Sequence, residues 1–284
     1  ARRYDRGYGH FTTRQNIQFN WTRLEEAPDI LADLAKVEMH AIQTSGNTIR
    51  NTTADPFAGV AADEIEDPRI TCEIIRQWST LHPEFSFLPR KFKIAVTGSP
   101  NDRAVIKAHD IGLRVLRNDA GEVGYQVIVG GGLGRTPVVG ETIREFLPKE
   151  HLLAYCEAIL RVYNLHGRRD NKFKARIKIL VKALTPEGFA EKVEAEWQHI
   201  KESPTRLTPE AIQRIQAYFT EPDYAAIDNA TDLLASQRFE NRGFDQWLTH
   251  NVDTHKKAGY AIVSLTMKKT GTPPGDVSDK QLEQ

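Results

Sequence analysis

The sequence predicts a mixed α+β fold in which antiparallel sheets are faced by helices. Segments such as residues 9–19 and 88–96 alternate polar and apolar side chains, which is the period of a strand. Segments such as residues 21–43 and 68–81 repeat apolar side chains at helical spacing. Because strands and helices interleave without a regular βαβ rhythm, a doubly wound parallel sheet is excluded.

The composition narrows the class of protein. The 284 residues suffice for one large domain or two of ordinary size. Lysine and arginine together number 38, as do aspartate and glutamate, so the formal net charge is zero and nucleic acid is a disfavoured partner. Only two cysteines occur, Cys72 and Cys156, which suits a reducing compartment such as the cytoplasm. No apolar run approaches membrane-spanning length, so we expect no membrane partner.

Residues 9–19 predict a first strand with one face made only of hydrogen-bonding groups. That face consists of Thr12, Arg14, Asn16 and Gln18. A helix predicted over residues 21–43 follows. Residues 44–51 then have the composition of a loop, in which Arg50 stands among small polar residues.

The strand predicted over residues 88–96 presents paired ammonium groups. Lys91 and Lys93 share one face, and the other face carries the apolar residues that seat the strand in a core, Phe92, Ile94 and Val96. For a lysine pair alone, a solvated outer face is the commoner explanation. Together with Arg14 and Arg50 from separate segments, however, the pair indicates a pocket for a strongly anionic ligand.

A hairpin and a glycine run follow. Residues 111–117 and 124–129 alternate as two strands around a turn, and the second strand runs into Gly130, Gly131 and Gly132. Such a run lets backbone amides approach a bulky anion, or it is a flexible hairpin end. It is not a dinucleotide fingerprint, because no helix is expected immediately after it.

The remaining segments are assigned by periodicity and composition. Helices are predicted over residues 141–164 and 186–203, whereas residues 51–67 and 204–245 are expected to be irregular or connecting. The basic stretch of residues 167–178 fits a helix or a strand, and its composition favours a helix at its start. A solvated basic face is the commoner explanation for such a stretch.

Three motifs in this order resemble the sirohaem-dependent sulfite and nitrite reductases: Thr12-Thr13-Arg14-Gln15, Arg50-Asn51 and Leu88-Pro89-Arg90-Lys91-Phe92-Lys93. The run Gly130-Gly131-Gly132-Leu133 and the basic segment after Gly167 continue the likeness, which spans residues 7 to 181. Within this family the chain is most similar to the bacterial assimilatory sulfite reductase haemoprotein, the beta subunit. The resemblance implies a ferredoxin-like half-domain joined to a sirohaem reductase-type α+β domain with antiparallel sheets.

The resemblance also implies roles for individual residues. It places Arg50, Lys91 and Lys93 among the catalytic, substrate-facing cations, which offset the charge of a small oxyanion. Sirohaem carries many carboxylates and requires a basic pocket. The residues expected to bind it are Thr12, Arg14, Asn16, Gln18, Asn51, Gly130, Gly131, Gly132, Arg169, Lys172 and Arg176. The family's [4Fe-4S] cluster needs two close pairs of cysteines, and neither cysteine of this chain lies in such a pair, so no metal ligand is expected here.

Domain boundaries are expected from the same resemblance. The expected order is an incomplete ferredoxin-like half-domain over residues 1–65, the reductase-type domain over 66–203, a connector over 204–257 and the start of a second ferredoxin-like repeat over 258–284. The chain is therefore interpreted as a fragment of an enzyme. As a hypothesis, a strand over residues 261–267 docks beside the strand over residues 11–19.

The expected activity of the complete enzyme is the assimilatory reduction of sulfite to sulfide at sirohaem coupled to a [4Fe-4S] cluster. Electrons would come from a flavoprotein or a ferredoxin. Reduction of nitrite to ammonia is the alternative activity, and a non-catalytic module that binds a tetrapyrrole or an anion is the alternative class. A related monooxygenase of corrin synthesis lacks the second lysine, so Lys93 argues against it. The fragment alone is expected to be inactive.

Overall fold

The computed structural model describes residues 1–225 and 231–284, and the chain divides into two compact units. The first unit contains Ala1–Thr44, Thr231–Asp253 and Val263–Gln284. The second unit contains Ser45–Ala230 and Thr254–Ile262. The compact units thus change at Thr44, and the family-based domain boundaries at residues 65, 203 and 257 stay a prediction.

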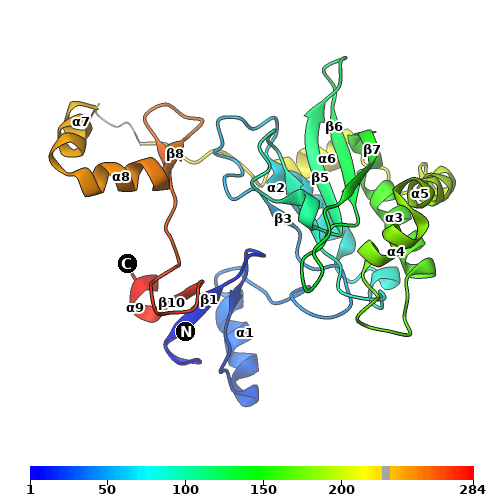
Figure 1. The fold of residues 1–284 in the computed structure, drawn as a ribbon, viewed down its shortest axis with the longest axis horizontal. Coiled ribbons are helices and arrows are strands. Elements are labelled where there is room, and N and C mark those ends of the chain that lie inside the picture. Colours follow the sequence, from blue (N-terminus) through cyan, green and yellow to red (C-terminus); the bar gives the residue numbers. More distant parts are fainter. Residues whose placement is uncertain (226–230) are drawn as a thin grey trace. The chain divides into compact units, whose positions relative to one another are not determined.

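A five-stranded mixed sheet forms the centre of the second unit (Figure 1). Its order is β3-β4-β5-β6-β7, and the strands are Thr53–Ala54, Ile94–Thr97, Ile111–Arg117, Val123–Val129 and Glu141–Pro148. β3, β4 and β5 pair in parallel, whereas β5, β6 and β7 pair antiparallel. The predicted α+β class and the predicted β5–β6 hairpin are confirmed.

The two-residue period of these strands separates two faces of the sheet. Ile94 lies opposite Ile111, and both are fully buried in the main core. The neighbouring residues point the other way, where Ala95 and Ile128 pack with Ile106 in a smaller core. Both faces of β4 are therefore covered, and all four of its residues, Ile94–Thr97, are buried.

Helices complete the main core of the second unit. They are α2 (Pro68–Ser79), α3 (Leu152–His166), α4 (Ile177–Leu184), α5 (Pro186–Ile200) and α6 (Pro209–Gln216), with short 3-10 turns at Pro83–Phe85, Ile106–Ala108 and Lys149–His151. α2 begins at Pro68 as predicted, because the Asp67 carboxylate accepts a hydrogen bond from the backbone N–H of Arg69 at 2.9 Å. None of the helices in the described ranges is long and apolar enough to cross a membrane.

A three-stranded antiparallel sheet of order β10-β1-β2 organises the first unit. Its strands are Tyr8–Phe11 (β1), Ile17–Gln18 (β2) and Asp276–Ser278 (β10), and its helical segments are Leu24–Glu26, Ala27–Ala35 (α1), Thr231–Glu240 (α7), Arg242–Asn251 (α8) and Asp279–Leu282 (α9). Ser278 and Gln281 form a capping box at the start of α9. A further two-stranded sheet pairs β8 (Val252–Thr254) with β9 (Ala261–Val263).

Several predictions of local structure are wrong. Residues 9–19 form a hairpin instead of one strand, because Gln15 adopts a left-handed conformation with φ of 56° between β1 and β2. Residues 141–148 belong to β7 instead of a helix, because they pair with β6. The start of the basic stretch is irregular, since α4 begins only at Ile177. The first helix ends at Ala35, well before the expected residue 43.

The middle and end of the chain also differ from expectation. The region 51–67 contains β3, and the predicted connector contains α6 and α7, while residues 226–230 of it lie outside the described residues. The hypothesis that residues 261–267 dock beside the strand over residues 11–19 is wrong in the segment that it names. β9 pairs with β8, and β10 is the strand that pairs with β1, where Gly9 lies opposite Val277.

Candidate anion-binding site

The lysine-bearing segment lies directly before β4, which begins only at Ile94, so the strand predicted over residues 88–96 is shorter than expected. Phe92 is fully buried, and its backbone forms a parallel bridge with Ile49. The backbone N–H of Arg50 donates to the carbonyl oxygen of Phe92 at 2.8 Å. Lys91 and Lys93 flank the buried ring and are themselves half-buried. The structure therefore brings Arg50 next to the lysine pair, although the two segments are about forty residues apart in sequence.

The charges of this region act on one another. Burial lowers the pKa of Arg50, and the charges of Arg90 and Arg176 lower it further. Burial also lowers the pKa of Lys91, and so do the charges of Arg50, Arg90 and Arg176. A bound anion would relieve this mutual repulsion, so the arrangement is typical of an anion-binding site.

Asp110 is the acid at the centre of these cations, and sequence reasoning missed it. Its side chain is completely buried and accepts hydrogen bonds from the Lys93 backbone N–H at 2.8 Å and from the Arg176 guanidinium at 2.7 and 3.0 Å. Burial raises the pKa of Asp110, while the charge of Arg176 and its hydrogen bonds oppose that rise. The only available signal was an acid standing directly before a buried apolar strand.

The glycine run packs against the same cations. The Gly130 N–H donates to the carbonyl oxygen of Asp110 at 3.1 Å, and Gly132 exchanges two backbone hydrogen bonds of 2.9 Å with Val138. A Cβ atom at Gly131 would lie 2.2 Å from the carbonyl oxygen of Lys107, so only glycine fits there. The amides of Gly130 and Gly132 thus stabilise the loop itself, and the binding of a cofactor by the glycine run stays a prediction.

Lys178 holds the rest of this loop and was also missed by sequence reasoning. Its side chain is nearly buried, and its ammonium donates to the carbonyl oxygens of Leu133 at 3.3 Å and Thr136 at 2.5 Å. Burial and the charge of Arg176 lower the pKa of Lys178. We call the set Arg50, Arg90, Lys91, Lys93, Asp110, Arg176 and Lys178 the basic site.

Two of the expected cofactor-binding residues have other contacts in the second unit. Arg169 is exposed and donates to the carbonyl oxygen of Phe87 at 2.9 Å and to the side chain of Asn164. Lys172 is exposed, and its ammonium lies 5.3 Å from the centroid of the Phe173 ring. Both residues lie in the irregular segment before α4, where Arg169 fastens that segment to the end of α3.

The four expected macrocycle contacts of the hairpin belong to the first unit. The Thr12 hydroxyl accepts hydrogen bonds from the backbone N–H groups of Arg14 and Asn16, each at 3.3 Å, so it shapes the turn. The Gln18 amide donates to the Asn20 side chain at 2.5 Å. Their assignment to the cofactor stays a prediction, as does that of Asn51, which is half-buried directly after Arg50.

The chain has too few cysteines to supply the four thiolate ligands of a [4Fe-4S] cluster. Cys72 is half-buried in α2, and Cys156 is buried in α3, where burial raises the pKa of its thiol to about 12. Four thiolates are needed for such a cluster, and the whole sequence has two cysteines. Within the described ranges, no group of three or more His, Cys, Asp or Glu side chains could hold a metal ion.

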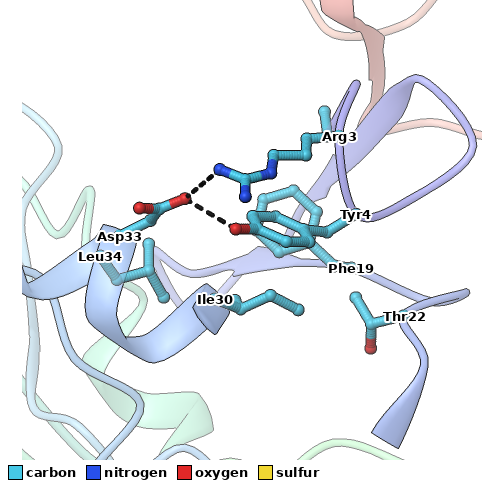
Figure 2. Close-up of a pocket in the computed structure, with 8 residues that line it drawn as sticks. Arg3, Tyr4, Phe19, Thr22, Ile30, Asp33 and Leu34 are labelled. Atoms are coloured by element: carbon cyan, nitrogen blue, oxygen red, sulfur yellow. Dashed lines mark hydrogen bonds and ion pairs between the residues drawn. The ribbon is translucent and has the colours of Figure 1, made fainter. Parts of the chain in front are cut away.

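Two surface pockets lie apart from the predicted site residues. One, of about 270 Å³ in the first unit, is lined by Phe19, Ile30 and Leu34, with Asp33 bound to Arg3 at 3.3 Å and to the Tyr4 hydroxyl at 2.9 Å (Figure 2). The other, of about 300 Å³ in the second unit, contains the ion pairs Arg69–Asp67 at 2.6 Å and Lys256–Glu221 at 2.9 Å. Because the named cations of each pocket are paired with acids, neither pocket resembles the basic site.

Two family models match the chain, one in each of its two main parts. The family model described as the nitrite and sulphite reductase 4Fe-4S domain matches residues 45–201, and the model of the nitrite/sulfite reductase ferredoxin-like half domain matches residues 1–37. The second match confirms the expected ferredoxin-like half-domain at the start of the chain.

Among curated relatives, sulfite reductase [ferredoxin] 1 of Mycolicibacterium paratuberculosis is 30% identical over 194 residues, which cover 68% of this chain and 35% of that protein. Ferredoxin–nitrite reductase of Leptolyngbya laminosa is 32% identical over 198 residues, which cover 68% of this chain and 39% of that protein. The chain thus spans little more than a third of the length of these relatives.

Solved structures agree with the fold. The structure of the Mycobacterium tuberculosis NirA protein has a TM-score of 0.65 at 27% identity and covers 70% of this chain and 36% of that one. Dissimilatory sulfite reductase I, at 13% identity and a TM-score of 0.56, shares the fold. With a family model matching more than half of its residues, the chain belongs to the sirohaem-dependent nitrite and sulfite reductase family.

Proposed function

We propose that the complete protein reduces sulfite to sulfide and that the basic site of this chain holds the carboxylates of sirohaem and the oxyanion substrate. The observation that carries the proposal is the position of Arg50 beside the lysine segment, where its backbone N–H donates to the Phe92 carbonyl oxygen at 2.8 Å. Burial, and then the charges of neighbouring cations, lower the pKa values of Arg50 and Lys91. Such crowding is costly in an empty site and favourable once an anion is bound. The donor chemistry of the site therefore fits a macrocycle fringed with carboxylates.

The cations of this chain would act on the substrate oxygens. When bound, sirohaem would supply the iron that takes up the oxyanion and receives electrons. The ammonium of Lys91 would donate a hydrogen bond to a substrate oxygen, and its lowered pKa favours release of the proton as that oxygen departs in water. Lys93 and Arg50 would stabilise the negative charge that remains.

We assign no residue of this chain a role in binding the [4Fe-4S] cluster. Its four thiolate ligands do not fit the two cysteines present, so they would come from another part of the complete protein. We propose a ferredoxin as the electron donor, because ferredoxin is part of the names of both curated relatives described above. A flavoprotein donor has no such support.

Nitrite is the second candidate substrate. The observation in its favour is that the assimilatory ferredoxin-dependent nitrite reductase of Haloferax mediterranei is 33% identical to this chain over 199 residues, as similar as the sulfite reductases are. Both substrates are small oxyanions that the same cations would bind.

The test is an assay of the full-length protein with a reduced viologen dye and each oxyanion in turn. We expect sulfide from sulfite, with a larger kcat/KM than for ammonium from nitrite. Ammonium as the main product would assign nitrite as the substrate. If neither product forms while the sirohaem absorbance is present, the protein is a tetrapyrrole-binding module and the reductase proposal is wrong.

A further inference from the structure

We propose that Asp110 is a positioning residue, which orients Arg176 and the Lys93 backbone so that the basic site binds an oxyanion or a carboxylate. This inference rests on the proposed function, because it assumes that an anion occupies the basic site. Asp110 is an acid, and its negative charge would by itself repel that anion. The contacts of Asp110 explain why an acid stands there.

Three separate segments of the chain meet at Asp110. One carboxylate oxygen accepts the Lys93 backbone N–H at 2.8 Å, and the other accepts the Nε and Nη2 groups of Arg176 at 3.0 and 2.7 Å. The carbonyl oxygen of Asp110 accepts the Gly130 N–H at 3.1 Å. The residue therefore joins the lysine segment, the glycine run and the start of α4.

These contacts fix the direction of the Arg176 guanidinium. An arginine fork held at two nitrogens by one carboxylate has a defined plane, and its remaining N–H groups keep a fixed direction for a second acceptor. The Arg176 side chain is 14% exposed, so part of it is still accessible to a ligand. It also contributes to lowering the pKa of both Arg50 and Lys91, which places its charge in the same region as theirs.

Two roles of Asp110 predict opposite results when its charge is removed. If the carboxylate acted only through its charge, Asp110→Asn would remove a repulsion and tighten anion binding. If it positions Arg176, the same variant would weaken binding, because the guanidinium loses its anchor. The sign of the change in affinity thus separates positioning from simple electrostatics.

The chain offers a matched control in Asp55. This carboxylate is also buried, with a side chain 2% exposed, and it accepts the Phe57 backbone N–H at 2.8 Å and the Arg103 Nε group at 2.9 and 3.0 Å. It lies in the second unit, outside the basic site. Asp55→Asn therefore reproduces the loss of a buried ion pair without touching the site.

The experiment titrates the full-length protein with inorganic sulfite, and in parallel with nitrite, by isothermal calorimetry, and measures thermal unfolding of each variant. We expect Asp110→Asn to raise the dissociation constant of the anion about tenfold and Asp55→Asn to leave it within twofold, with similar losses of Tm. Asp110→Glu should restore part of the affinity. Arg176→Lys, which keeps the charge but loses the fork, should weaken binding as Asp110→Asn does.

The outcomes separate this inference from the proposed function. Equal or tighter anion binding by Asp110→Asn overturns the positioning role while leaving the proposed reductase intact. If Asp55→Asn weakens anion binding as much as Asp110→Asn does, the positioning role is also overturned, because the loss of affinity would then result from the loss of protein stability. Binding of nitrite but not of sulfite by the unaltered protein removes the proposed substrate, and a weakened nitrite affinity of Asp110→Asn would still support positioning. Should Asp110→Asn fail to fold, unchanged binding by Arg176→Lys would decide against the inference.

Discussion

Arg50 donates its backbone N–H to the carbonyl oxygen of Phe92 at 2.8 Å, and Phe92 in turn donates its own N–H to Thr48 at 3.0 Å. This pair of hydrogen bonds continues the parallel pairing of β3 with β4 beyond the ends of both strands. Because the Phe92 side chain is completely buried, a one-residue slip in this pairing would expose it, so the positions of Lys91 and Lys93 relative to Arg50 are fixed. The placement of Arg50 beside Lys91 and Lys93 is therefore a property of the sheet.

Replacement of Lys93 by methionine in the full-length protein should lower the turnover of the proposed reductase activity, with little loss of sirohaem. Methionine keeps most of the apolar stem but removes the charge and the three N–H donors. We expect kcat for sulfide formation to fall about 10²-fold, as for the loss of one preorganised donor. Lys182→Met, an exposed lysine of α4, is the matched control and should retain full turnover. Unchanged kcat in Lys93→Met would contradict a role at the substrate.

The 284-residue chain, purified alone, should contain no iron–sulfur cluster. Its two cysteines are in different helices, and the buried Cys156 has a pKa of about 12, so it is a poor thiolate ligand. The measurement is iron and acid-labile sulfide per chain, together with the visible absorbance after reconstitution. Four iron and four sulfide per chain would disprove the prediction.

Stability should depend on pH through Glu64. Burial raises the pKa of this carboxyl to about 7 from an ordinary value of 4.5, although its oxygen accepts the Gly59 N–H at 2.8 Å. A raised pKa means that the folded protein holds the proton more tightly than the unfolded chain, so the contribution is complete below pH 4.5 and is lost as the pH rises to about 7.

Relative to Glu64→Gln, the unaltered protein should therefore lose free energy of unfolding over that pH range. Since the side chain is only half-buried, solvent screening reduces the expected loss to about 1–2 kcal/mol. Urea unfolding of both proteins at pH 4.5 and at pH 7.5 gives the comparison. A difference between them that does not change with pH would show that Glu64 ionises normally.

Gly131→Ala should destabilise the second unit and disturb the basic site. The new methyl group would lie 2.2 Å from the backbone oxygen of Lys107 and 2.6 Å from that of His109, so the loop must move. We expect a loss of about 1–3 kcal/mol in the free energy of unfolding, together with weaker anion binding. Gly188→Ala is the control, because its added methyl group meets only the Thr185 hydroxyl at 3.6 Å, and helix α5 should become slightly more stable. Equal stability of the two variants would contradict the close approach at Gly131.

The sequence predicted the parts of the fold that depend on local pattern. α2 follows Pro68 and its cap Asp67, and the β5–β6 hairpin follows two alternating runs around a turn. β7 was taken for a helix because its side chains are only partly buried, so its alternation is weak and merges with that of α3. The hairpin of β1 and β2 was missed because its turn places Gln15 at positive φ, where glycine or asparagine is the usual signal.

Of the basic site, the sequence predicted several of the cations but not Asp110 or Lys178. Arg50, Lys91, Lys93 and Arg176 are recognisable from charge within alternating or loop segments, and the structure brings them together in one unit. Asp110 and Lys178 act through contacts with segments 17 to 66 residues away, which no local pattern reports. The cluster ligands could be excluded from sequence because a count of cysteines is sufficient.

The pairing of β1 with β10 has a consequence for biosynthesis. His10 and Asp276 are in contact at 2.7 Å although 266 positions separate them. While the ribosome is still translating the intervening segment, β1 has no partner on that edge, whereas the strands β3 to β7 are all encoded within about a hundred consecutive residues and can assemble as they emerge. The second unit would thus assemble first, while one edge of β1 stays unpaired and open to wrong strand pairing until β10 has been made.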